Sequence, residues 1–142
     1  MSCFLITVDP TLAELDGPSY TTAMQHLIHH ADHPPLVPLM VVVSLISPLV
    51  SLYLLRRDKS SSAFKYTLAA FALFIVVLYI TIVLNVPINN AITSWKVTAL
   101  PSDWAEQRSH WHALNLYRTP ASALAFFAHI LACLSLGRQT QK

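Results

Sequence analysis

Long runs of apolar residues without a charge recur three times along the chain. Leu36 to Leu55 contains only uncharged residues, and a helix of this length, rising about 1.5 Å per residue, covers roughly the 30 Å of a bilayer core. Phe64 to Leu84 carries a single lysine at its start, and its length favours a second spanning helix over a strand. Ala121 to Leu136 is shorter, but tryptophan and tyrosine precede it and can extend a helix into the membrane interface. The pattern predicts three membrane-spanning helices.

The remaining apolar segments are shorter. The first eight residues, MSCFLITV, resemble the end of a hydrophobic helix whose beginning is missing. Between Asp9 and Pro35 an amphipathic helix is expected, with Pro18 and Ser19 as its start signal. We therefore expect an all-α fold: a single membrane domain over residues 1–142, forming a transmembrane antiparallel helical bundle of the four-helix type with its first helix truncated. Residues 85–118 are expected to form an extramembrane segment.

Composition supports a multi-pass integral membrane protein. The chain is 54% hydrophobic and 11% charged, with a mean hydropathy of +0.51, values that are wrong for a water-soluble domain of this size. The net charge is only +2 and the basic residues are scattered, so nucleic acid is not expected as a partner. Cys3 and Cys133 lie far apart in the sequence and form no CxxC motif.

The distribution of basic residues predicts the orientation of the helices. The connection from Arg56 to Lys65 contains four Lys or Arg, whereas residues 1–55 contain none. By the positive-inside rule this loop and the C-terminus face the cytoplasm. The N-terminal segment and the stretch from Asn85 to Arg118 then share the opposite side.

The stretch from Trp104 to Thr119 concentrates polar and aromatic residues. A helix starting after Ser102 or Asp103 and continuing past a kink at Pro120 would align two series of residues spaced by seven on one inward stripe. The stripe consists of Arg108, Asn115, Ser122 and His129 together with Trp104, Trp111, Arg118, Ala125 and Ala132. The tryptophans could also be simple interfacial anchors. That alternative explains Arg108 and Asn115 less well, because polar groups on an inward stripe need partners or a ligand.

Two further clusters could carry chemistry. Asn85 and Asn89 lie one helical turn apart with Pro87 between them, an arrangement that fits either the edge of a polar pocket or a capped helix end. Four histidines (His26, His29, His30 and His33) include two pairs at i, i+4 spacing, which can bind a metal. No cysteine or HExxH glutamate accompanies them, so we expect solvated or interfacial histidines and no metal site.

These motifs resemble a known family. The segment NVPINN, Trp95, the sequence PSDW, and the spaced residues Arg108, Trp111, Asn115 and Arg118-Thr119 are similar to the recurring signature of the anthrone oxygenase-like family of small four-span membrane proteins. The upstream stretch DPTLAELDGPSYTTAMQ is also similar, so the resemblance extends from about Val8 to Leu136. Two features depart from the family pattern: the first span is reduced to MSCFLITV, and Ile28 stands where asparagine is frequent.

The resemblance implies an activity as well as a fold. It implies a monooxygenase that oxidises a hydrophobic polyketide anthrone to an anthraquinone with O₂, with no cofactor, neither metal nor flavin. In that reading His112 is the first choice of catalytic base and His129 the second. The predicted substrate-binding residues, which would hold substrate oxygens or stack on its rings, are Asn85, Asn89, Trp104, Arg108, Trp111, Asn115 and Arg118. The expected partners are an aromatic small molecule and membrane lipid.

A non-enzymatic function is the alternative. A small membrane bundle could bind a lipophilic molecule or a partner subunit, including a second copy in a homo-oligomer, and use its Trp and Arg residues only as anchors. Small residues form faces suited to helix contact on the first predicted span (Ser44, Ser47 and Ser51) and on the third (Ala121, Ala125, Ala128 and Ala132).

Overall fold

The computed structural model describes residues 9–32 and 36–139, and these contain helices and no strand, which confirms the all-α prediction. The elements are α1 (Asp9–Glu14), α2 (Gly17–Asp32), α3 (Leu36–Leu55), α4 (Ser62–Tyr79), the π-helix η2 (Ile80–Asn85), α5 (Val86–Ser94) and α6 (Trp104–Gln139). The segment MSCFLITV, His33 and the pair Pro34-Pro35 lie outside the described residues, so the expectation of a truncated first span stays a prediction.

Among the described residues, three helices are long and apolar enough to cross a membrane: α3, the continuous run Ser62–Ser94 made of α4, η2 and α5, and α6. Each predicted span lies within one of them. The second continues ten residues beyond Leu84, and the third begins at Trp104 and runs through Pro120 without a break in the helix.

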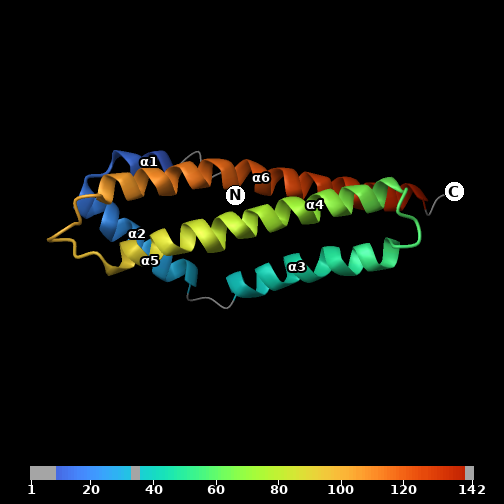
Figure 1. Ribbon diagram of the computed structural model, residues 1–142, viewed down its shortest axis with the longest axis horizontal. Coiled ribbons are helices and arrows are strands. Elements are labelled where there is room, and N and C mark those ends of the chain that lie inside the picture. Colours follow the sequence, from blue (N-terminus) through green and yellow to red (C-terminus); the bar gives the residue numbers. More distant parts are fainter. Residues whose placement is uncertain (1–8, 33–35, 140–142) are drawn as a thin grey trace. The chain divides into compact units, whose positions relative to one another are not determined.

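The chain forms two compact units. One unit comprises residues 36–77 together with α6 from Pro120 onward. Within it, Figure 1 shows α3 and α4 running antiparallel on either side of a short loop. At the end of that loop Ser61 caps α4, because its Oγ accepts a hydrogen bond from the Phe64 N–H at 3.2 Å.

The side chains of this unit are distributed in a way that is typical of membrane-spanning helices. Its buried positions are mostly small, namely Ala63, Thr67, Ala70, Ala125 and Ala132. Its exposed positions include many large apolar side chains, such as Leu54 and Phe126, which are 71% and 65% exposed. Small buried residues let helix backbones approach closely, while large exposed ones contact lipid tails. The alanine face predicted on the third span is thus the less exposed one, whereas Ser44 and Ser47 on α3 are exposed.

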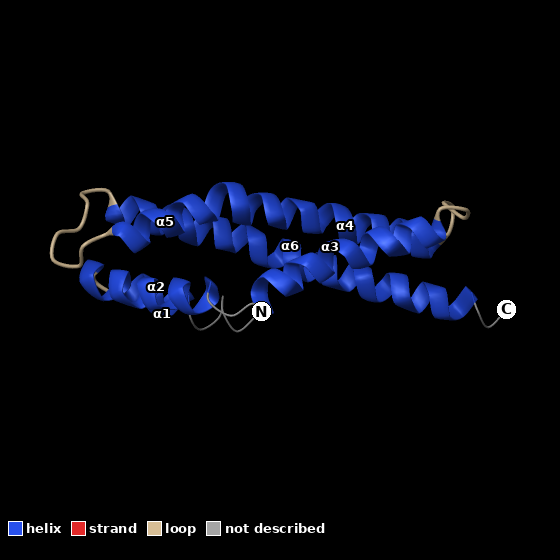
Figure 2. Cartoon of the chain, turned by 90° about the horizontal axis from the view of Figure 1, so that it is seen from below, coloured by secondary structure: helices blue, strands red, loops and turns tan. Residues whose placement is uncertain are grey.

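The other unit comprises α1, α2 and residues 78–119. Its hydrophobic core is formed by Leu12, Tyr20, Met24, Ile28, Ile92 and Trp111. Figure 2 shows α1 and α2 lying next to each other, and α2 also packs against α5. The helix expected between Asp9 and Pro35 is α2, which begins after Asp16, whose carboxylate accepts a hydrogen bond from the Ser19 N–H at 3.3 Å.

Gly17 permits a close approach at the start of α2. A Cβ atom at this position would lie 2.5 Å from Cδ1 of Leu100 and 3.2 Å from the ring of Trp104. A larger residue would need the Leu100 side chain to turn aside and the Trp104 ring to shift by a few tenths of an ångström. Glycine at this position therefore allows the Leu100 and Trp104 side chains to pack directly against the start of α2.

The π-helix η2 changes the spacing of buried residues along the second long helix. The buried positions Ala63, Ala70 and Val77 are seven residues apart, the next interval, to Asn85, is eight, and Ile92 follows after seven. A π-turn accommodates one more residue than an α-turn. Because η2 takes up the additional residue, Asn85 and Ile92 remain on the buried face of the helix.

Candidate functional site

A hydrogen bond between two predicted site residues joins α5 to α6. The indole Nε1 of Trp111 donates to Oδ1 of Asn89 at a distance of 3.0 Å. Trp111 is 5% exposed and belongs to the hydrophobic core, so its ring is held in place by packing as well as by this bond. The structure thus brings together the NVPINN segment and the tryptophan and arginine segment.

Two buried asparagines lie one helical turn away from this hydrogen bond: Asn85 precedes Asn89, and Asn115 follows Trp111. Asn85, at the end of η2, is 2% exposed and Asn115, on α6, is 1% exposed. Nδ2 of Asn115 donates to the carbonyl oxygen of Trp111 at 2.9 Å. Neither polar atom of the Asn85 side chain, nor Oδ1 of Asn115, has a hydrogen-bond partner among the described residues. Such buried unpaired groups are rare and costly, and they mark places where a polar ligand can bind.

Arg108 contacts the N-terminal helices. Its Nη1 donates to the carbonyl oxygens of Leu15 at 2.9 Å and Ala13 at 3.3 Å, near the C-terminus of α1. Its guanidinium also lies 4.9 Å from the centre of the Trp104 ring and 5.7 Å from that of Tyr20. The Arg108 side chain therefore pairs with carbonyl groups at the end of α1 and with two aromatic rings. These contacts assign Arg108 a role in holding α1 against α6, and place Trp104 beside it.

The stripe predicted on α6 coincides with the less exposed side of the helix. Trp111, Asn115, Ala125 and Ala132 are buried, and the five other members are all partly buried. By contrast Leu116 and Tyr117 are 53% and 69% exposed. Arg118 is partly buried one turn after Asn115 and makes a polar interaction of its own.

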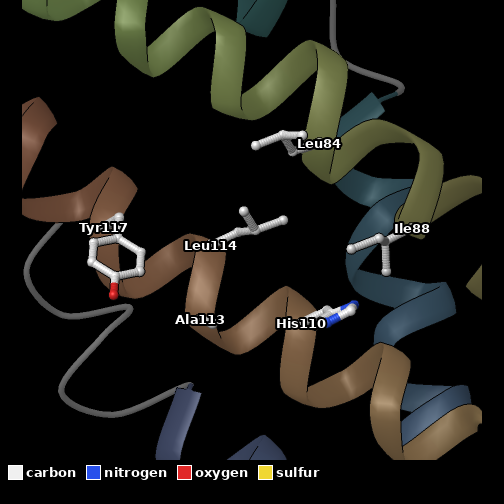
Figure 3. A pocket seen from close by; sticks show the side chains of 6 residues that line it. All are labelled: Leu84, Ile88, His110, Ala113, Leu114 and Tyr117. Carbon is white, nitrogen blue, oxygen red and sulfur yellow. The ribbon is translucent and has the colours of Figure 1, made fainter.

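A groove lies between η2, α5 and α6, on a different face of α6 from the stripe. Its lining residues are Leu84, Ile88, His110, Ala113, Leu114 and Tyr117, and its volume is about 310 Å³. Figure 3 shows Leu84 opposite Leu114, with His110 below Ile88. We call this the Leu84–Tyr117 groove. It has the size of a small-ligand site, and its mostly apolar lining with few polar groups is typical of one.

The histidines chosen from the sequence lie elsewhere. His112 is exposed and lines a much smaller cavity of about 10 Å³ together with Tyr20, Arg108 and Trp111, a volume close to that of a single water. His129 is partly buried and belongs to the other compact unit. The histidine that lines the Leu84–Tyr117 groove is His110.

Sequence reasoning missed His110, Tyr117 and Gln25. His110 and Tyr117 share the spacing of seven that drew attention to the stripe, so the signal was present on a neighbouring face of the helix. Gln25, on α2, donates from Nε2 to the carbonyl oxygens of Ile92 and Trp95, each at 3.0 Å. It satisfies carbonyls at the end of α5 from another helix, and no local sequence pattern indicates such a contact.

The histidines of α2 show no grouping of ligands. His26, His29 and His30 are exposed, and Nδ1 of His30 lies 2.8 Å from the carbonyl oxygen of His26. Within residues 9–32 and 36–139, three or more His, Cys, Asp or Glu side chains nowhere gather as metal ligands would. The expectation of no metal site stays a prediction, because His33 lies outside the described residues.

Comparison with known proteins identifies a family. The model of a family described as anthrone oxygenase matches residues 27–128. The match includes α5, the Leu84–Tyr117 groove and both buried asparagines. No curated protein and no solved structure matches the chain significantly.

Proposed function

Because the chain belongs to the anthrone oxygenase family, we propose that it is a multi-pass membrane protein that oxidises a hydrophobic polyketide anthrone to an anthraquinone with O₂. The family match over 27–128 is the observation that carries the proposal. The three long apolar helices support the membrane location. A flat aromatic substrate partitions into lipid, so an enzyme in the membrane would meet it where it accumulates.

The substrate itself can supply the electrons for this reaction. Removal of one proton from the anthrone methylene gives an anion stabilised by the flanking rings. The anion combines with O₂ and a proton to give a carbon-bound hydroperoxide, which loses water to leave the second ketone. One oxygen atom enters the product and the other leaves as water, so the four electrons removed from the methylene carbon balance the reduction of O₂. The protein has to provide a base, hydrogen-bond donors for the developing oxyanion, and an apolar site.

The Leu84–Tyr117 groove fits these requirements better than the other cavity. Its volume of about 310 Å³ lies at the lower end of the range for small-ligand sites. Leu84, Ile88 and Leu114 offer apolar contacts to a planar ring system, and His110 and Tyr117 are its polar groups. We propose that the substrate binds here.

His110 is the base we propose for proton removal. It is the histidine that lines the groove, and a general base must lie within hydrogen-bond reach of the proton that it removes. His112, the first choice from the sequence, lies on a cavity too small for an aromatic ring system. His129 remains the second alternative.

The proposal is tested with purified protein in lipid nanodiscs and emodin anthrone, following quinone formation and O₂ consumption together. Anthrones oxidise slowly in air, so nanodiscs without protein give the background rate. We expect a rate well above background and a loss of about 10²-fold or more in His110→Ala. Matched variants His112→Ala and His129→Ala should retain most of the activity. No acceleration over background would overturn the proposed reaction, and a selective loss in either matched variant would move the base.

A binding function without chemistry is the second candidate. The groove is lined by exposed as well as half-buried side chains, among them Leu84 and Tyr117, an arrangement that also suits a lipid or another lipophilic molecule. Binding of anthrones without accelerated oxidation would favour this candidate.

A further inference from the structure

Asn85 and Asn115 are each the next residue in sequence after a leucine that lines the groove. Leu84 precedes Asn85, and Leu114 precedes Asn115. Successive residues of a helix point about 100° apart. The two asparagines are therefore turned by about 100° from the groove lining on both helices, and there both are nearly inaccessible.

The hydrogen bond between Trp111 and Asn89 shows where these two amides lie along the axis of the helix pair. The chain reverses direction between α5 and α6, so the two helices run antiparallel in this unit (Figures 1 and 2). Asn85 precedes Asn89 by one turn and Asn115 follows Trp111 by one turn, so both steps lead the same way along the helix pair. Figure 3 agrees, since Leu84 lies opposite Leu114. The two asparagines therefore lie at the same height along the axis of the helix pair.

Their polar atoms are unused although they are complementary. Nδ2 and Oδ1 of Asn85 and Oδ1 of Asn115 have no hydrogen-bond partner among the described residues. Asn85 could donate to Asn115, and the two side chains do not form that bond. A ligand group carrying both a donor and an acceptor would satisfy them, and a neutral group suits the site because neither amide is charged.

We propose that Asn85 and Asn115 form the polar end of the substrate site, and that they bind the edge of a planar aromatic ligand on which a hydroxyl lies beside a ketone. The hydroxyl donates to an amide oxygen and the ketone accepts from Nδ2 of Asn85. Leu84 and Leu114 then separate this polar end from the apolar groove, and the ligand reaches it when their side chains turn aside. The inference rests on the proposed function for the location of the ligand, but it concerns recognition and not oxidation.

The unpaired amides also predict an unusual effect of substitution on stability. A buried polar group without a partner opposes folding, and its replacement by an apolar side chain of similar size is neutral or stabilising. Asn85→Leu should therefore leave the thermal unfolding midpoint unchanged or raised while weakening ligand binding. A purely structural asparagine would behave in the opposite way, because its loss would lower the midpoint.

The experiment measures binding of emodin and of unsubstituted anthraquinone to protein in nanodiscs, by quenching of tryptophan fluorescence against protein-free nanodiscs. We expect the wild-type protein to bind emodin at least about tenfold more tightly than anthraquinone. Asn85→Leu should lose that preference and bind anthraquinone as before. Asn90→Ala, an exposed asparagine on the same helix, is the matched control and should keep it.

Each outcome decides between recognition and structure. An unchanged preference for emodin in Asn85→Leu would overturn the inference, even if the protein oxidises anthrones. Failure of both Asn85→Leu and Asn85→Ala to fold would overturn it as well, because unpaired amides cannot be required for folding. A chain that does not oxidise anthrones but loses emodin binding on Asn85→Leu would refute the proposed reaction and keep the subsite.

Discussion

The indole N–H of Trp111 donates a 3.0 Å hydrogen bond to Oδ1 of Asn89, which connects two segments separated by the α5–α6 connection. Trp111→Phe would keep most of the ring and remove this donor. We expect it to lower the free energy of unfolding by about 1–3 kcal/mol, because Oδ1 of the partly buried Asn89 then lacks its partner. Thermal or chemical unfolding in detergent provides the measurement.

A double-mutant cycle isolates that bond from the rest of the packing. Once Trp111→Phe has removed the donor, Asn89→Ala should cost less than it does in the wild-type chain. The coupling should be on the order of 1 kcal/mol. Additive effects of the two changes would show that the bond contributes nothing measurable.

Arg108 is expected to be intolerant to substitution because of its contacts with α1. Arg108→Ala removes charge-assisted hydrogen bonds to the carbonyls of Ala13 and Leu15, which are typically worth about 1.5–3 kcal/mol. Unfolding in detergent should report a loss of that size, and limited proteolysis should show faster cleavage near α1. Gln107→Ala on the same helix should cost well under about 1 kcal/mol, since its amide bonds only to the exposed Asp103. Equal losses in the two variants would contradict the assignment.

Gln25 should be sensitive to the loss of its amide donor. Gln25→Glu keeps the size of the side chain but cannot donate to the carbonyls of Ile92 and Trp95. We expect a lower midpoint of unfolding above neutral pH, where the glutamate is charged and faces carbonyl oxygens. Thr22→Ala, at an exposed position on the same helix, should change the midpoint little. A midpoint unchanged by Gln25→Glu would show that this capping contributes nothing to stability.

The orientation of the helices remains a prediction of the charge distribution. Ser62 and Ser102 are both exposed, and in a chain with Cys3 and Cys133 replaced by serine either can carry a cysteine probe. A maleimide that cannot cross membranes should label Ser102→Cys on intact cells and Ser62→Cys only after permeabilisation. Ser62 is preferable to its neighbour Ser61, whose Oγ caps α4. Labelling of both positions in intact cells would refute the orientation.

We expect the purified protein to hold no stoichiometric transition metal. Nδ1 of His30 is already close to the His26 carbonyl, and a site with too few ligands binds weakly. Elemental analysis should find far less than one Fe, Cu or Zn per chain. About one equivalent that disappears in a His26→Ala, His30→Ala variant would reverse the prediction.

The fold was largely predictable from the sequence because lipid solvent leaves a simple signal. In a bilayer an uncharged run such as Leu36 to Leu55 forms a helix, because a helix satisfies its backbone hydrogen bonds within the segment. Length and hydropathy were therefore sufficient to locate the three long helices. The π-helix was not predictable, because Ile80–Asn85 has the composition of an ordinary apolar helix. It coincides with the interval of eight between the buried residues Val77 and Asn85, and no local propensity describes that interval.

The site was predictable only in part for a similar reason. The spacing of Trp111 and Asn115 correctly indicated the less exposed side of α6, because helix periodicity is local. The carbonyl partners of Arg108 are separated from it by more than 90 residues, and backbone acceptors leave no mark in a sequence. His110 shares the local signal, but only the approach of Leu84 and Ile88 from another helix reveals its groove.

The interval of eight residues between Val77 and Asn85 makes the length of this segment a constraint on evolution. Deletion of one residue from the stretch 80–84 would restore a regular α-helix with a buried interval of seven and would leave Asn85 and Ile92 on the buried face. Insertions and longer deletions would turn both residues away from that face and should be rare here, although substitutions among Ile, Val and Leu would be harmless. Selection would preserve the helical face on which the buried residues lie, more than the identity of the apolar residues in this stretch.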